Sequence, residues 1–138
     1  RILIRKMKII LTVILTAMLF SCSKDDFSTG IHSSVLFGMV SCMPVIDESA
    51  REYEKYDGRI YLINKESADS MGQPGFVLLK QGSTSLVIRN GKLSAELPAG
   101  TFVVMTEEYF VNEPANTITI SDGQITDQDI KIWVCTSY

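Results

Sequence analysis

The chain has 138 residues, of which 46% are hydrophobic and 21% are charged, and this composition favours a single globular domain. The charge is unevenly distributed, because residues 1 to 21 contain four cations and no acid. The other residues hold 9 cations against 16 acids, a formal charge of −7. Such an acidic body argues against nucleic acid as a partner, since phosphates need a basic surface.

The first predicted element is an apolar run from Ile9 to Phe20, interrupted by two threonines. Its 12 residues are too few to span a bilayer, which takes about 20. A buried core helix is the alternative, but a soluble fold would have to cover its apolar surface on all sides. The length and the preceding cations instead predict a secretory signal peptide over residues 1–21. Met7 begins the signal pattern, so residues 1–6 are expected to lie upstream of the true start.

A cysteine ends this segment in the sequence Leu19-Phe20-Ser21-Cys22, where an ordinary signal peptide has small residues before its cleavage site. The sequence resembles the lipobox of bacterial lipoproteins, in which the cysteine is diacylated and becomes the first mature residue. The resemblance implies that Cys22 carries the lipid, and two or more acyl chains hold a protein stably on a membrane. The polar residues 22–33 are accordingly predicted to form a flexible, lipidated tether.

The residues after the cysteine include Lys24, Asp25 and Asp26, which resemble the surface-export signal of Bacteroidetes-type lipoproteins. The resemblance implies an outer-membrane protein displayed on the cell surface. The periplasmic face is the alternative, because the same residues also suit a solvated linker. The membrane, contacted through the lipid, is therefore the first predicted partner.

From residue 34 onward, apolar and polar residues alternate along short segments that are separated by turns, a pattern typical of a β-sandwich. The turn Asn90-Gly91 is the strongest hairpin signal in the chain, because both positions tolerate a positive φ. The predicted strands cover residues 34–42, 59–64, 75–81, 84–97 on both sides of Asn90-Gly91, 101–108, 116–121 and 129–137. Residues 48–56 predict either a short helix or a loop with one helical turn. The expected fold is all-β, a single antiparallel sandwich of about seven or eight strands over residues 34–138.

Two further segments resemble carboxypeptidase regulatory-like domains, Gly72-Gln73-Pro74-Gly75-Phe76-Val77 and Leu97-Pro98-Ala99-Gly100-Thr101-Phe102-Val103. The resemblance implies an Ig-like or prealbumin-like β-sandwich that serves as a non-catalytic accessory. Domains of this family are usually joined to an enzyme or a transporter, which this chain does not contain. The protein is therefore expected to act alone or with a separate partner.

Cys42 and Cys135 remain once Cys22 is assigned to the lipid. They fall on the first and last predicted strands of an exported domain, where disulfide bonds persist. The two cysteines are predicted to form a disulfide, with two separate buried thiols as the alternative.

Candidate catalytic and metal-binding residues are few. His32 is the only histidine and falls in the predicted tether, which cannot hold it rigidly as a catalytic base. The acids near predicted turns are expected to be solvated, with a glycosidase pair or a loose calcium site as alternatives. These acids are Glu107, Glu108, Asp122, Asp127 and Asp129. No catalytic residue, no metal site and no cofactor is predicted.

Tyr109 and Phe110 are the predicted binding face, because they fall in a loop where large apolar side chains have little structural reason to be. The leading prediction is a lipid-anchored, non-catalytic binding or adhesion module for a glycan, a host protein or another envelope protein. A structural subunit of an outer-membrane complex or fibre is the alternative. A small glycan hydrolase is a weaker alternative.

Overall fold

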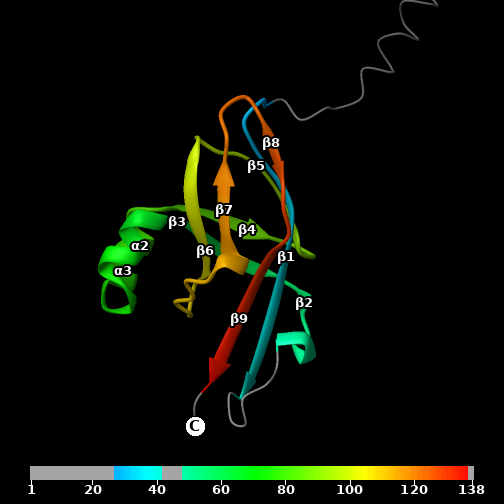
Figure 1. Ribbon diagram of the computed structural model, residues 1–138, viewed down its shortest axis with the longest axis vertical. Coiled ribbons are helices and arrows are strands. Elements are labelled where there is room, and N and C mark those ends of the chain that lie inside the picture. Colours follow the sequence, from blue (N-terminus) through cyan, green and yellow to red (C-terminus); the bar gives the residue numbers. More distant parts are fainter. Residues whose placement is uncertain (1–26, 42–47, 137–138) are drawn as a thin grey trace, which may run out of the picture.

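Figure 1 shows the computed structural model, which describes residues 27–41 and 48–136. Within these residues nine strands form two sheets that pack face to face. The predicted all-β sandwich is confirmed. One detail of the prediction is wrong, because one strand runs parallel to two of its neighbours and the fold is not purely antiparallel.

The four-stranded sheet is antiparallel throughout and has the order β4-β3-β6-β7. Its strands are β3 (Gly58–Asn64), β4 (Thr84–Ile88), β6 (Gly100–Thr106) and β7 (Thr117–Ile120). Alternate residues of β3 point to opposite faces, as the two-residue period of a strand requires. Ile60 and Leu62 face the other sheet, whereas Ile63 faces the helices. This sheet is therefore buried on both faces along part of its length.

The five-stranded sheet is built around the long strand β1 (Gly30–Ser41). The first half of β1 lies between β5 (Lys92–Glu96) and β8 (Ile125–Asp127), and the second half lies between β2 (Glu54–Lys55) and β9 (Ile130–Thr136). β1 is antiparallel to β2 and β5 and parallel to β8 and β9. It is thus a central strand as far as Phe37, and from Gly38 to Ser41 β9 is its one paired neighbour among the described residues.

The predicted tether, residues 22–33, is too long by four residues, since Gly30 to Ser33 belong to β1. Ile31 explains the difference, because its side chain is fully buried between the two sheets. The neighbouring His32 lies on the outer face of the strand, as the two-residue period requires. The prediction that His32 sits on a mobile segment is therefore wrong.

Two short helices cover the outer face of the four-stranded sheet (Figure 1). They are α2 (Lys65–Met71) and α3 (Phe76–Gln81), joined by a 3-10 turn, η2 (Gln73–Gly75). The N-cap of α2 is Asn64, whose side chain accepts a hydrogen bond from the Ser67 amide at 3.2 Å. The strand predicted over residues 75–81 is wrong, because that segment is α3. Its Leu79 is buried on the sheet while the two preceding apolar residues face solvent.

Trp133 of β9 is covered on the outer face of the five-stranded sheet by the segment that precedes β3. This segment contains a 3-10 turn, η1 (Glu48–Ala50), and then β2, so the loop alternative for residues 48–56 is the one observed. The Arg51 guanidinium lies 5.0 Å from the centre of the Trp133 ring, and the Tyr53 ring meets it edge-on at 5.5 Å. Gly38 of β1 leaves the space into which the indole fits.

The main core lies between the two sheets, and its fully buried members include Ile31, Val35, Ile60, Ile118, Ile130 and Ile132. The predicted turn at Asn90-Gly91 is confirmed, with positive φ angles of 53° and 66°. Beyond the bridge between Arg89 and Lys92, the two strands separate, because β4 joins one sheet and β5 joins the other. The turn therefore connects the two layers.

Candidate functional site

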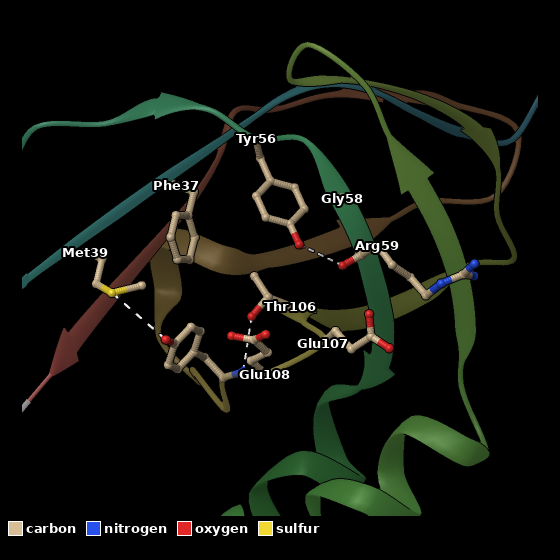
Figure 2. Close-up of a pocket in the computed structure, with 9 residues that line it drawn as sticks. Phe37, Met39, Tyr56, Gly58, Arg59, Thr106, Glu107 and Glu108 are labelled. Atoms are coloured by element: carbon tan, nitrogen blue, oxygen red, sulfur yellow. Dashed lines mark hydrogen bonds between the residues drawn. The ribbon is translucent and has the colours of Figure 1, made fainter.

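A pocket of about 280 Å³ opens where the second half of β1 faces the start of β3 and the end of β6 (Figure 2). It therefore lies between the two sheets, at an end of the sandwich that the core does not fill. We call it the inter-sheet pocket. Its lining consists of Phe37, Met39, Tyr56, Gly58, Arg59, Thr106, Glu107, Glu108 and Tyr109.

Tyr56 is placed by the short connection between β2 and β3. Its hydroxyl donates a hydrogen bond to the Arg59 carbonyl at 2.9 Å (Figure 2). Gly58 has a φ of +144°, and a Cβ at this position would lie only 2.9 Å from the Tyr56 hydroxyl oxygen. Glycine is favoured here because it tolerates the positive φ and leaves room for the phenol. The local sequence thus fixes the ring at the entrance to β3.

Three aromatic rings form a continuous apolar wall in the pocket. The ring centre of Phe37 lies 5.7 Å from that of Tyr56 and 6.3 Å from that of Tyr109, and both pairs are tilted. The Tyr109 amide donates to the Thr106 hydroxyl at 3.2 Å, and the Tyr109 hydroxyl contacts the Met39 sulfur at 3.9 Å. Because each ring comes from a different segment, only the folded chain assembles this wall.

Two carboxylates stand at the mouth of the pocket, those of Glu107 and Glu108, which we call the rim glutamates. Both residues are exposed. Burial raises the pKa of the Tyr56 phenol, and the negative charges of the rim glutamates raise this pKa further. The Arg59 guanidinium donates to the Ser85 hydroxyl on β4 at 3.0 Å, and Figure 2 shows it directed away from Tyr56. The lining of the pocket thus carries two carboxylates and one guanidinium, and the guanidinium is directed away from Tyr56.

The segment after β6, which carries Tyr109, is held to the scaffold by Asn116 at the end of η3 (Pro114–Asn116). The Asn116 side chain is fully buried and donates to the carbonyls of Val104 and Val111 at 2.8 and 2.7 Å. Its oxygen accepts a hydrogen bond from the Glu113 amide at 2.9 Å. One asparagine thus satisfies three backbone groups of the loop that forms one side of the pocket.

A polar cluster on the helix side fixes the same loop. The Lys65 ammonium donates to the carboxylate of Asp69 and to the side-chain oxygen of Asn112, both at 2.8 Å. The Asn112 amide also donates to Asp69 at 2.8 Å. These contacts lower the pKa of the Asp69 carboxyl group, with the hydrogen bond from Lys65 as the largest cause. They join α2 to the segment between β6 and η3.

The two members of the predicted binding face go to different places. Tyr109 lines the inter-sheet pocket, whereas Phe110 packs edge-on against Phe76 of α3 at 5.7 Å. The structure brings Tyr109 together with Phe37 and Tyr56, which the sequence did not single out as partners. Phe37 lies in a predicted strand, and Tyr56 lies in a segment for which a helix was one alternative, so neither had a local signal that pointed to a pocket.

The predicted lipidation site Cys22 and the predicted export signal at Lys24, Asp25 and Asp26 lie outside the described residues. Cys42 also lies outside them, so its disulfide with Cys135 stays a prediction. Cys135 itself is on β9, where it is paired with Val40 of β1. Val40, which lies opposite Cys135 in this register, is two positions before Cys42 in the sequence.

His32 lines a second, shallower pocket of about 330 Å³ on the outer face of the five-stranded sheet. The sheet register places it between Ser94 of β5 and Asp127 of β8, and Asp129 and Lys92 lie at the same pocket. The third predicted turn aspartate, Asp122, accepts a hydrogen bond from the Thr29 hydroxyl at 3.5 Å. Asp127 and Asp129 thus share one pocket, whereas Glu107 and Glu108 line the inter-sheet pocket.

The described residues hold neither a cluster that could bind a metal ion nor a helix that could span a membrane. Over residues 27–41 and 48–136, no three His, Cys, Asp or Glu side chains gather in a way that could hold a metal ion. None of the helices in these ranges is long and apolar enough to cross a membrane. No family model, curated protein or solved structure matches the chain, so its resemblances to bacterial lipoproteins and to carboxypeptidase regulatory-like domains rest on the quoted residues alone.

Proposed function

We propose that the protein is a non-catalytic binding module, anchored by lipid to a bacterial outer membrane, and that the inter-sheet pocket is its ligand site. The aromatic wall formed by Phe37, Tyr56 and Tyr109 is the observation that supports this most directly. Ligand sites are typically concave and mostly apolar, with a few placed polar groups. The pocket has this composition, and its rings are held by β1 for Phe37 and by hydrogen bonds of the connecting segments for Tyr56 and Tyr109.

The polar groups of the pocket favour binding over catalysis. The Tyr56 hydroxyl donates to a backbone carbonyl, and the Thr106 hydroxyl accepts from the Tyr109 amide. Each group therefore has a structural partner that holds it in place. An activated nucleophile instead needs a neighbouring base within hydrogen-bond reach. The contacts of these hydroxyls fit a role in shaping the pocket.

The position of the pocket suits an anchor at Cys22. From Cys22 to Gly30 there are eight residue steps, which reach at most about 26 Å, so the sandwich would stay close to the membrane. A strand rises about 3.3 Å per residue, so Phe37 lies about 23 Å along β1 from Gly30. The pocket would thus lie toward the end of β1 that is farther from the lipid.

The anchor is tested by replacing the lipidated cysteine. Wild-type chain and a Cys22→Ala variant are expressed in cells that are fed labelled palmitate. The wild type is expected to take up label and to fractionate with outer membranes. The Cys22→Ala variant is expected to do neither. An unlabelled wild type, or a variant that still partitions with membranes, would contradict the anchor.

The ligand site is tested by what the tagged chain retains when it is purified from membranes. A Tyr109→Ala variant removes one ring of the wall, and Ile125→Ala is the matched control because Ile125 is exposed on β8 and does not line the pocket. Mass spectrometry is expected to find molecules that the wild type and the control retain and that Tyr109→Ala loses. Equal retention by all three proteins would contradict a ligand site at the pocket.

A structural subunit of an outer-membrane assembly is the second candidate. Val77 and Leu78 are adjacent on α3, and 63% and 64% of their surfaces are exposed. Exposed apolar side chains of this kind often mark a contact with another protein. A photo-crosslinker at position 78 would capture one envelope protein reproducibly if this candidate is right, and a crosslinker at Glu66 would serve as the control.

A further inference from the structure

We propose that the occupant of the inter-sheet pocket is the positively charged side chain of a lysine or an arginine, presented by an extended peptide. This inference rests on the proposed function, because it names the chemistry of the ligand that the same pocket takes.

The three aromatic rings of the wall are suited to contact with a cation. A cation over an aromatic face, within about 6 Å of the ring centre, is attracted by the negative face of the ring. This chain uses such contacts elsewhere, since Arg51 lies over Trp133 at 5.0 Å and Lys80 lies over Phe76 at 4.5 Å. Among the described residues, the cation–ring contacts fall outside the wall of the pocket. The wall therefore offers three ring faces without a cation from the described part of the chain.

The carboxylates of the rim glutamates also favour a positively charged occupant. Neither rim glutamate takes part in an ion pair with another described residue. Two cations lie in the neighbourhood without an ion pair to the rim glutamates: the Arg59 guanidinium donates to the Ser85 hydroxyl, and the Lys80 ammonium donates to the backbone carbonyl of Glu107 at 2.7 Å. The rim glutamates line the same pocket as Tyr56, and their negative charges raise the pKa of its phenol beyond the larger effect of burial. A cation on the wall would thus lie beside two carboxylates and be stabilised by both.

The size of the pocket and its surroundings favour a side chain on a peptide. A volume of about 280 Å³ is at the lower end for ligand sites, which suits one long side chain. A second hollow of about 630 Å³ adjoins the pocket, because both are lined by Phe37 and Met39. This second hollow has Glu52 and Glu54 on its wall, and the Lys131 ammonium lies nearby over the Tyr53 ring. The two hollows meet at Phe37 and Met39 and together exceed the size of a single amine, and four glutamates line them against one arginine.

Binding is tested by calorimetric titration of the full chain in mild detergent with capped pentapeptides. The central residue is lysine, arginine or norleucine, and norleucine keeps the apolar stem without the charge. Butylammonium serves as a cation without a peptide. The lysine and arginine peptides are expected to bind at least about fivefold more tightly than the norleucine peptide. Their affinity should fall as salt rises from about 20 mM to about 200 mM, because salt screens exposed charges.

Variants then locate the site. A Glu107→Gln and Glu108→Gln double variant should lose at least about fivefold in affinity for the lysine peptide and little for the norleucine peptide. A Glu66→Gln and Glu96→Gln double variant is the matched control, because it also removes two exposed charges and neither residue lines the inter-sheet pocket. Both changes are at exposed positions, and circular dichroism checks that each variant is folded.

Each outcome decides between the claims. If the lysine and norleucine peptides bind equally tightly, and both bind less tightly to Tyr109→Ala, the proposal of a positively charged occupant is overturned. The proposed ligand site is then supported. If butylammonium binds as tightly as the lysine peptide, the proposal that a peptide presents the cation is overturned, and the ligand is a small cation instead. If no cation binds, the inference is overturned, and the retention experiment with Tyr109→Ala decides the proposed function separately.

Discussion

Replacement of Asn116 by alanine is expected to destabilise the whole domain, because this side chain satisfies two buried carbonyls and one partly buried amide of the backbone. The variant leaves the carbonyls of Val104 and Val111 and the amide of Glu113 without this partner. A buried polar group that loses its partner costs about 1–3 kcal/mol. Relaxation of the loop will recover part of the total, so we expect a loss of about 4 kcal/mol in the free energy of unfolding. Domains of this size have only about 5–15 kcal/mol in all.

The assay is urea unfolding followed by the fluorescence of Trp133, the only tryptophan in the chain. Thr117→Val is the control, because the Thr117 hydroxyl makes a single bond to the Glu113 carbonyl at 2.7 Å and its loss should cost about 1 kcal/mol. The Asn116→Ala variant should also lose ligand binding at lower urea than the control does, since the same loop carries Tyr109. A loss below about 1 kcal/mol for Asn116→Ala would refute the reasoning, because the three bonds would then not hold the loop.

Two further changes test other parts of the structure. Gly38→Ala would place a Cβ 2.5 Å from the Trp133 ring, so we expect a loss of about 2–3 kcal/mol in thermal or urea unfolding, and an unchanged midpoint would contradict the packing. Lys65→Met should raise the pKa of the Asp69 carboxyl group toward its ordinary value, measured by NMR titration of the carboxyl carbon, and an unchanged pKa would contradict the cluster. The folded-state pKa is depressed in the wild type, so this contribution to stability is present above the unfolded-state pKa and is lost as pH falls through the folded-state pKa.

The strands that alternate cleanly could be predicted from the sequence, and so could the turn at Asn90-Gly91. The helix α3 could not, because a short apolar run such as residues 76–79 fits a buried strand and a helix equally well. Leu79 is buried on the sheet and Phe76 packs against the same cluster, whereas Val77 and Leu78 turn to solvent. The start of α2 did have a signal, since Asn64 is a favourable N-cap residue and Glu66 lies in the first turn.

The candidate site was predictable only in part. Tyr109 could be singled out because a large ring in a loop lacks a local reason to be there. Phe37 and Tyr56 could not, because their sequence neighbourhoods are those of ordinary core residues. What joins the three rings is the packing of one sheet on the other, and that arrangement depends on contacts between distant segments. His32 was misplaced for a related reason, since a strand with polar residues on its outer face resembles a linker.

The parallel pairing of β1 with β9 has a consequence for how such a chain is made. Val35 and Ile130 are neighbours in the sheet although 95 positions separate them along the chain (35 and 130). Closing so long a loop is slow, and every contact that depends on it forms late. A chain threaded through a membrane from its N-terminus would expose one flank of its longest strand until the last segment emerged. An unpaired flank is a template for aggregation, so a chaperone that shields it during transit would protect this protein more than one that acts after release.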